Sequence, residues 1–248
     1  FLDAYEQAEQ RLVPASQSLI KEYQSVVGAI GYTPTRPEIA YYWGILCRCL
    51  TFPTSKLLDL AYRLVVYLGK TKTLGLNFSA AGDDAGILHC AGDSDWSVKR
   101  STSGFGAMFC CALVCWLSRR QHCVALSSVE AELIAMTTGA REIMYLRAIM
   151  EALLVDFELN APILDTDSKG AFDLVHRVTS GSHSRHVDRQ YFRVRQWRAG
   201  GYLVLRKVDG ALNWSDIFTK PLDTSPFQQH RKSIMNLCSK SSSAAAAA

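Results

Sequence analysis

Two apolar segments of this chain end in the same pattern, in which two aspartates flank one other residue. The first segment ends in Asp93 and Asp95, and the second ends in Asp165 and Asp167. Residues i and i+2 of a strand lie on the same face, so each pair of carboxylates repels itself unless a cation or solvent compensates the charge. The pattern therefore indicates two strands that present acidic side chains at one end.

A long helix is predicted between these two segments, and the capping box Ser127-Ser-Val-Glu130 marks its start. In this motif Ser127 is the N-cap and Glu130 reaches back to it, ahead of an apolar stripe from Leu133 to Met150. Glu132 is not needed for the cap, although the helix dipole favours a carboxylate in this turn. Taken alone, Glu132 is also explained as a solvated side chain on a polar face.

A fourth acid, Asp216, opens the amphipathic segment that follows Asn213. Taken alone, it is equally well explained as an acid at the start of a helix. Carboxylates from two strand ends and an intervening helix make a divalent-metal site the most economical explanation. Hard cations such as Mg²⁺ bind carboxylate oxygens, water and substrate phosphates.

The rest of the pattern predicts a helical first third followed by short strands. Apolar residues recur at helical spacing in residues 18–32, 37–50 and 55–67, and strand-like segments follow at 86–93, 103–111 and 112–118. Hydrophobic residues make up 48% of the 248 residues, enough for a sizeable core, and no apolar run reaches the roughly 18 residues of a membrane span. The eight cysteines contain no CxxC pair, which favours buried free thiols in a reducing compartment.

Several motifs occur in the order typical of copia-type LTR-retrotransposon polyproteins, and the chain resembles the ribonuclease H domain of that family. These motifs are Asp93-Ser-Asp-Trp96, Arg100-Ser-Thr-Ser-Gly104, Val124-Ala-Leu-Ser-Ser-Val-Glu-Ala-Glu132, Asp167-Ser-Lys-Gly-Ala171, Arg185-His-Val-Asp188 and Asp216-Ile-Phe-Thr-Lys-Pro221. Segments that resemble the end of the family's reverse transcriptase are Tyr23-Gln-Ser-Val-Val-Gly-Ala-Ile-Gly-Tyr32, Thr35-Arg-Pro-Glu-Ile-Ala-Tyr41 and Arg63-Leu-Val-Val-Tyr-Leu-Gly-Lys70.

The resemblance implies an α/β fold, a ribonuclease H-like mixed five-stranded sheet with flanking helices that is preceded by a small helical unit. The helical unit, which resembles the C-terminal or connection region of a reverse transcriptase, is expected at residues 1–80. The ribonuclease H-like domain is expected at residues 81–240. Residues 241–248, which are serines and alanines, are expected to be an unstructured or artificial tail.

The family's catalytic and metal-binding acids fall on Asp93, Glu132, Asp167 and Asp216. Glu132 is preferred to Glu130 because it matches the motif of the catalytic acid and the capping box already accounts for Glu130. These residues would hold two Mg²⁺ ions, with Mn²⁺ as a substitute. The function implied is a retrotransposon-derived endonuclease that cleaves the RNA strand of an RNA/DNA hybrid.

Nucleic-acid contacts are expected from the basic segment that begins at Arg185. Arg189 and Arg193 share a helix face four residues apart, which suits a phosphate backbone, and a solvated basic surface is the alternative. Ser168 stands where the family usually has an asparagine after its third catalytic acid. A second basic run, Arg119-Arg120-Gln-His122, is equally well explained as the end of a hairpin.

Departures from the family leave a second function open. The acidic turn that usually follows the Asp-Trp pair is shortened to Ser97-Val98, and Val208-Asp-Gly-Ala-Leu-Asn213 replaces the usual Pro-Thr loop. The shortened turn, a missing polymerase core, the absent initiator Met and the alanine tail suit a noncatalytic, retroelement-derived structural or binding subunit of a larger assembly, with other chains as partners. Under either function we expect no membrane partner and an intracellular, reducing location in the cytoplasm or nucleus, with an organelle still open.

Overall fold

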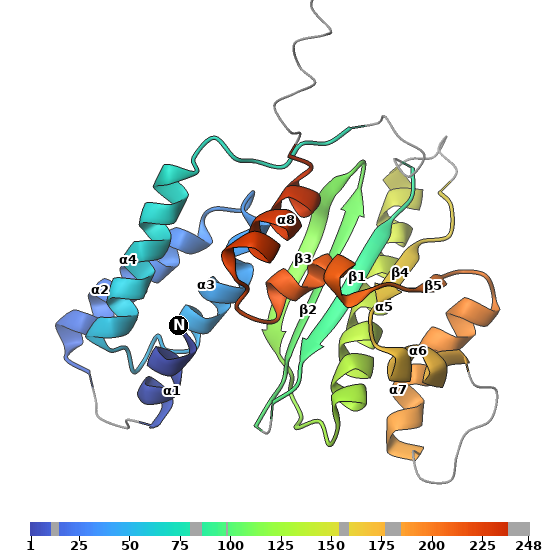
Figure 1. The fold of residues 1–248 in the computed structure, drawn as a ribbon, viewed down its shortest axis with the longest axis horizontal. Helices are drawn as coiled ribbons and strands as arrows, with labels where there is room; N and C mark the ends of the chain where they lie inside the picture. Colours follow the sequence, from blue (N-terminus) through green and yellow to red (C-terminus); the bar gives the residue numbers. More distant parts are fainter. Residues whose placement is uncertain (11–14, 80–85, 98, 154–158, 177–184, 238–248) are drawn as a thin grey trace, which may run out of the picture. The chain divides into compact units, whose positions relative to one another are not determined.

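The computed structural model describes residues 1–10, 15–79, 86–97, 99–153, 159–176 and 185–237, with the backbone alone at Glu9 and residues 185–191 (Figure 1). The predicted tail at 241–248 lies outside these ranges. The chain divides into two compact units, Phe1–Gly75 and Leu76–Ala248. Among the described helices, none combines the length and the hydropathy that a membrane span requires.

The described part of the first unit is helical. It comprises α1 (Leu2–Gln10), α2 (Gln17–Gly31), the 3-10 turn η1 (Pro37–Ile39), α3 (Ala40–Cys47) and α4 (Ser55–Lys70). The hydroxyls of Ser16 and Thr54 cap α2 and α4 by accepting hydrogen bonds from backbone N–H groups of the first turn. Tyr23, Leu46 and Leu57 are fully buried at the centre of this unit, so it has a hydrophobic core of its own.

The second unit contains the expected mixed five-stranded sheet. Its strands are β1 (His89–Asp95), β2 (Thr102–Phe109), β3 (Ala112–Arg120), β4 (Ile163–Thr166) and β5 (Val204–Lys207), in the order β3-β2-β1-β4-β5. Strands β1, β2 and β3 form an antiparallel meander, and β4 pairs in parallel with both β1 and β5. The first strand continues past its expected end at residue 93, because Asp95 still pairs with Thr102.

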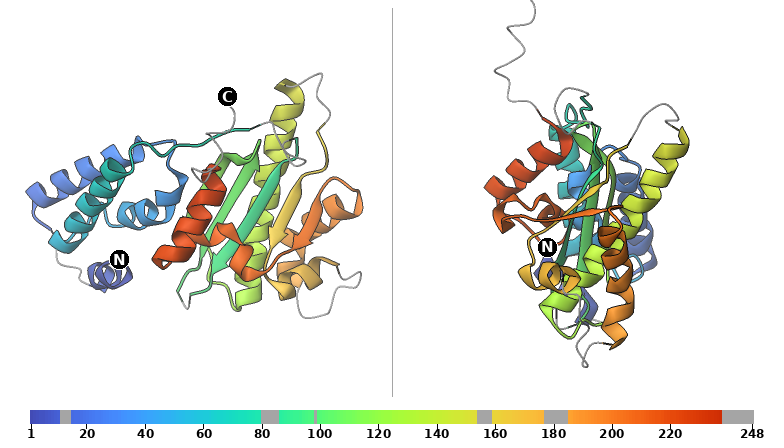
Figure 2. Two further views of the ribbon diagram at one scale, coloured as in Figure 1. Left: turned by 45° about the horizontal axis from the view of Figure 1, so that its top comes forward. Right: turned by 90° about the vertical axis from the view of Figure 1, so that its right-hand side faces the viewer.

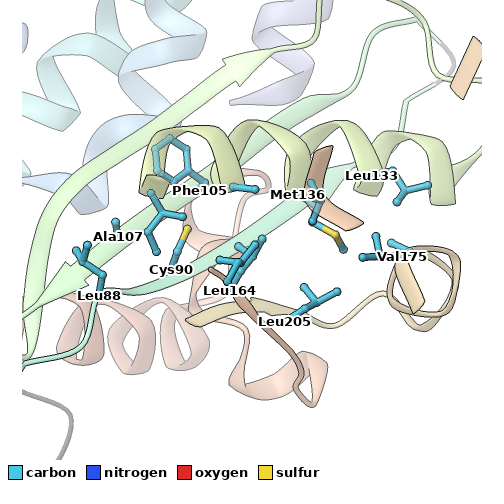
Figure 3. Packing of buried hydrophobic residues seen from close by; sticks show 14 residues of the cluster. Leu88, Cys90, Phe105, Ala107, Leu133, Met136, Leu164, Val175 and Leu205 are labelled. Carbon is cyan, nitrogen blue, oxygen red and sulfur yellow. The ribbon is translucent and has the colours of Figure 1, made fainter. Parts of the chain in front are cut away.

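Helices cover both faces of this sheet (Figure 2). The long helix α5 (Ser128–Leu153) packs on one face, with α6 (Lys169–His176) and α7 (Arg185–Ala199) beside it. The core between α5 and the sheet contains Cys90, Phe105, Leu133 and Leu164, all nearly or fully buried (Figure 3). Side chains at even positions of β1, such as Cys90, face α5, so the odd positions face the opposite side.

The opposite face carries the last part of the chain. The 3-10 turns η2 (Gly210–Leu212) and η3 (Trp214–Phe218) are followed by α8 (Thr224–Met235), the last helix of the described residues, and η3 lies against β1 and β2. A Cβ atom at Gly104 would lie 2.6 Å from the Cβ of Phe218, and one at Gly106 would lie 2.7 Å from the ring of Trp214. These glycines let η3 approach the sheet closely, which brings Asp216 to the strand ends.

Candidate active site at the ends of the parallel strands

The parallel pairing of β1 and β4 brings two of the predicted acids to the same edge of the sheet. Ala91 pairs with Asp165 across these strands, so the residues two positions further on, Asp93 and Asp167, lie at the same level. Asp93 is 3% exposed, and Asp167 is half-buried just after the end of β4. The two carboxylates therefore lie at the same edge of the sheet, one buried and the other half-buried.

The third acid, Asp216, comes from η3, more than a hundred residues after Asp93 in the chain. Two contacts hold this turn in place: the Ser118 hydroxyl on β3 donates to the Phe218 carbonyl at 2.6 Å, and the Thr219 hydroxyl donates to Oδ2 of Asp93. Asp216 is 9% exposed, and its Oδ2 forms an ion pair with the Lys220 ammonium at 2.8 Å.

Asp93, Asp167 and Asp216 form a compact cluster of carboxylates. One oxygen of each residue lies within 4.8 Å of those of the other two, close enough to share a metal ion. Burial, followed by the charge of Asp93, raises the pKa of Asp167 and raises that of Asp216 to about 7. Like charges held this close in a partly buried site disfavour full ionisation, so the cluster favours a bound cation.

Glu132 lies beside this cluster rather than within the group of three. Its pKa is raised to about 9, mainly by burial and then by the charges of Asp93 and Asp167, although the backbone N–H of Ser94 donates a hydrogen bond to it. Its Oε2 is buried and has no hydrogen-bond partner among the described residues. The structure thus brings the fourth predicted acid near the others and leaves one of its oxygens available to a ligand.

The start of α5 separates the roles of the two neighbouring glutamates. The backbone N–H of Glu130 donates to the Ser127 hydroxyl at 3.2 Å, and the Glu130 carboxylate accepts from the N–H of Leu126 at 2.7 Å. The capping box is present, with Glu130 reaching one residue beyond the cap. Glu130 is therefore used by the helix end, and Glu132 faces the acids.

The other aspartate of each pair has a different environment. Asp95 is near the cluster, and its pKa is raised by burial and then by the charge of Asp93. Asp165 accepts hydrogen bonds from His89 at 2.6 Å and from Nε of Arg206 at 2.7 Å. Burial raises the pKa of Asp165, but these bonds outweigh it and hold the pKa below its ordinary value. Asp165 therefore links β1, β4 and β5 and has no free charge to offer a metal.

The residues predicted to contact nucleic acid lie in different environments. The Ser168 hydroxyl accepts from the N–H of Ala171 at 3.2 Å and so caps α6. Arg193 on α7 is exposed, with its guanidinium 5.2 Å from the centre of the Trp197 ring. Arg185 and Arg189 also belong to α7, but their side chains lie outside the described residues.

Two residues of the site had no predicted role, namely Thr219 and Lys220. Both lie in the motif that contains Asp216, and that adjacency is the sequence signal for them. Burial lowers the pKa of Lys220. Its hydrogen bond to Asp216 and the charges of Asp93 and Asp167 raise the pKa by more than burial lowers it, so the net pKa lies above the ordinary value. Lys220 therefore places a positive charge beside the acids.

No family model matches this chain, but its sequence is similar to transposon polyproteins. The retrovirus-related Pol polyprotein from transposon TNT 1-94 of Nicotiana tabacum is 29% identical over 212 residues, which cover 83% of this chain and 16% of the polyprotein. The corresponding polyprotein from transposon RE1 of Arabidopsis thaliana is 28% identical over 218 residues, which cover 86% of this chain and 15% of the polyprotein. The secreted RxLR effector protein 161 of Plasmopara viticola is 35% identical over 130 residues, 50% of this chain and 90% of that protein.

Solved structures with a similar arrangement include ribonucleases H. RNase H1 from Halobacterium salinarum NRC-1 matches with a TM-score of 0.39 and 15% identity, over 54% of this chain and 94% of that one. The foamy viral protease-reverse transcriptase in complex with an RNA/DNA hybrid matches with a TM-score of 0.46 and 12% identity, over 91% and 29% of the two chains. The sequence relatives of this chain thus include retrovirus-related Pol polyproteins of plant transposons, of which it spans about a sixth, and its second unit contains a mixed five-stranded sheet flanked by helices.

Proposed function

We propose that this chain is a metal-dependent endonuclease that cleaves the RNA strand of RNA/DNA hybrids. The observation that carries the proposal is the cluster of Asp93, Asp167 and Asp216, whose oxygens lie within 4.8 Å of one another. Three separate elements supply these side chains, and the sheet, the glycines of β2 and the Thr219 hydroxyl hold them together. Self-repelling buried acids are costly to maintain, so their assembly indicates a use for the charge.

The donor set fits hard divalent cations. All ligands are carboxylates, and two buried oxygens, Oδ1 of Asp216 and Oε2 of Glu132, have no hydrogen-bond partner within the described part of the chain. We propose two Mg²⁺ ions, for which Mn²⁺ can substitute, held by Asp93, Glu132, Asp167 and Asp216. When bound, such a pair would supply a more acidic water as nucleophile and stabilise the leaving oxygen.

The chain's own residues hold this site in shape. Thr219 fixes one oxygen of Asp93, and Ser118 anchors the turn that carries Asp216. Exposed Arg193 is proposed to contact the substrate backbone, as are Arg185, Arg189 and Ser168. Discrimination between the RNA and DNA strands would come from contacts to ribose 2′-hydroxyls beside the acids.

The second candidate, a noncatalytic subunit of a larger assembly, makes different demands on the same residues. A structural subunit needs no ion in the acidic cluster. Replacing its acids with neutral side chains would therefore not impair its role. The buried, unpartnered oxygens of Asp216 and Glu132 favour the enzyme, because a structural role would leave them without compensation.

The test is a cleavage assay with a labelled RNA/DNA hybrid. The full chain should cut the RNA strand in Mg²⁺ or Mn²⁺, and Asp93→Asn should abolish cleavage while the protein stays folded. Asp59→Asn, which removes the same charge from an exposed position on α4, is the matched control and should cleave normally. A folded wild-type chain that shows no metal-dependent cleavage would favour the noncatalytic subunit.

A further inference from the structure

A polar pocket of about 240 Å³ lies between the edge strand β3 and helix α5. Its lining contains Arg119 and Arg120 at the end of β3, His122 just after that strand, and Arg141 with Glu142 from α5. Three arginines thus surround it against one glutamate. No role in the carboxylate cluster accounts for this concentration of positive charge.

The pocket is separate from the acids but adjoins them. Ser103, which also lines it, pairs with Arg119 on β3 and with Ser94 on β1. Ser94 directly follows Asp93, and because side chains alternate, the two point to opposite faces of the sheet. The pocket therefore lies on the α5 face, one residue away from the catalytic acid along β1.

Gln121 connects the pocket to β1 and α5, the two elements that carry Asp93 and Glu132. This side chain is 5% exposed and lines the pocket, and its Nε2 donates to Ser103 Oγ at 2.8 Å, to the Ala131 carbonyl at 2.9 Å and to Ser94 Oγ at 3.2 Å. Ser94 adjoins Asp93, and Ala131 adjoins Glu132. The carbonyl oxygen Oε1 of Gln121 is buried and has no hydrogen-bond partner among the described residues.

The charges of Arg119 and Arg141 are available for a ligand. Both side chains are exposed, and within the described ranges neither forms an ion pair with a carboxylate. Guanidinium groups bind phosphate oxygens through two parallel N–H donors. An unpartnered carbonyl such as Oε1 of Gln121 requires a hydrogen-bond donor instead, and a ribose hydroxyl is one.

We propose that this pocket binds the sugar-phosphate backbone of the nucleic-acid substrate, with Arg119 and Arg141 on a phosphate and Gln121 on a sugar hydroxyl. This inference rests on the proposed function, because it assumes that a hybrid bound at the acids continues along the protein to the pocket beside β3. The volume is below the roughly 300 Å³ at which small-molecule sites begin, which favours one phosphate and sugar of a longer chain over a complete small ligand.

The test measures binding without cleavage. A fluorescent RNA/DNA hybrid is titrated with the full chain in EDTA at several salt concentrations, and the anisotropy gives the dissociation constant. The double variant Arg119→Gln/Arg141→Gln should bind more weakly, and its salt dependence should fall by a slope of about two, one for each lost phosphate contact. Lys56→Gln/Lys232→Gln removes two exposed charges from α4 and α8 and should bind as wild type does.

Four further outcomes decide the interpretation. Equal binding and equal salt slope in the double variant and the control would overturn the pocket, whereas absent cleavage with an intact pocket effect would count against the proposed function alone. Equally weakened hybrid binding in both double variants would mean unspecific charge attraction and would also overturn the pocket proposal. Inorganic phosphate at millimolar concentration should compete with the hybrid only weakly, and strong competition that depends on Arg119 would reassign the pocket to a free oxyanion.

Discussion

The ammonium of Lys220 lies 2.8 Å from Oδ2 of Asp216, and its positive charge interacts with all three clustered carboxylates. The sequence places each acid at a strand or helix end and suggests a metal as the compensating charge, but it does not single out Lys220. Lys220 partly offsets that repulsion in the protein without metal. A bound cation would have to compete with it for Asp216.

The first prediction concerns this competition. Lys220→Met should lower the stability of the metal-free protein by about 0–1 kcal/mol, a small amount because the Lys220 side chain is 41% exposed. The same variant should gain more stability from Mn²⁺ than wild type does, since the metal no longer displaces an ammonium group. Thermal melts in EDTA and in Mn²⁺ measure both effects, with Lys220→Arg as the charge-conserving control. A smaller metal-induced shift in Lys220→Met would mean that Lys220 assists the metal.

The second prediction concerns pH. The pKa of Glu132 is about 9 and that of Asp216 is about 7, both above the ordinary range of a carboxyl group, so the folded protein holds these protons more tightly than the unfolded chain. The two protonated groups therefore contribute to the free energy of unfolding. This contribution is complete below about pH 4, the ordinary pKa range of carboxyl groups, and is lost as the pH rises towards 9.

Urea unfolding in EDTA between pH 5 and pH 9 should therefore show a free energy of unfolding that falls as the pH rises. Glu132→Gln removes one of these protons and should flatten the upper part of the curve. With saturating Mg²⁺ the decline should weaken or reverse, because deprotonated ligands bind metal better. A wild-type stability that rises with pH in EDTA would contradict the assignment.

The third prediction concerns the close approach of η3 to the sheet. In Gly104→Ala the new methyl group would lie 2.6 Å from Phe218 and 2.6 Å from Cγ2 of Thr219, so the turn must move. We expect a loss of about 1–3 kcal/mol in stability and a larger loss in metal affinity, because the turn carries Asp216. Gly28→Ala is the control, since a methyl group there meets nothing within 4 Å and should be neutral or slightly stabilising in a helix. If Gly104→Ala is destabilised but keeps its metal affinity, the position of this turn does not determine metal binding.

The fourth prediction concerns the first unit. A chain that begins at Leu76 keeps the hydrogen bond from the N–H of Asn77 to the Met235 carbonyl at 3.1 Å, the whole core around α5 and all four acids. It should retain metal-dependent cleavage, because the residues before Gly75 contribute no member of the cluster. Circular dichroism establishes whether the shortened chain folds, and the hybrid assay then measures its activity. A well-folded but inactive product would assign the first unit a part in catalysis.

Local patterns in the sequence identified much of the site. The i, i+2 spacing of Asp93 and Asp95 indicates a strand end, and the capping box predicts the start of α5 and distinguishes Glu130 from Glu132. Such features depend on neighbours within one helical turn or one strand, so they can be read without knowing the rest of the fold. The assignment of a late acid to the same site came from resemblance to a family, because nothing local ties Asp216 to β1.

Tertiary structure decided how these parts meet. Asp165 and Asp167 look alike in sequence, but His89 and Arg206 from neighbouring strands neutralise Asp165, whereas Asp167 is left with the charge of Asp93. Likewise the glycines of β2 matter only because η3 returns across them, and Gln121 becomes a buried junction only because β1, β2 and α5 converge on it. Hydrogen bonds and charge pairs between residues far apart in the chain depend on strand order and packing, which a single local pattern does not encode.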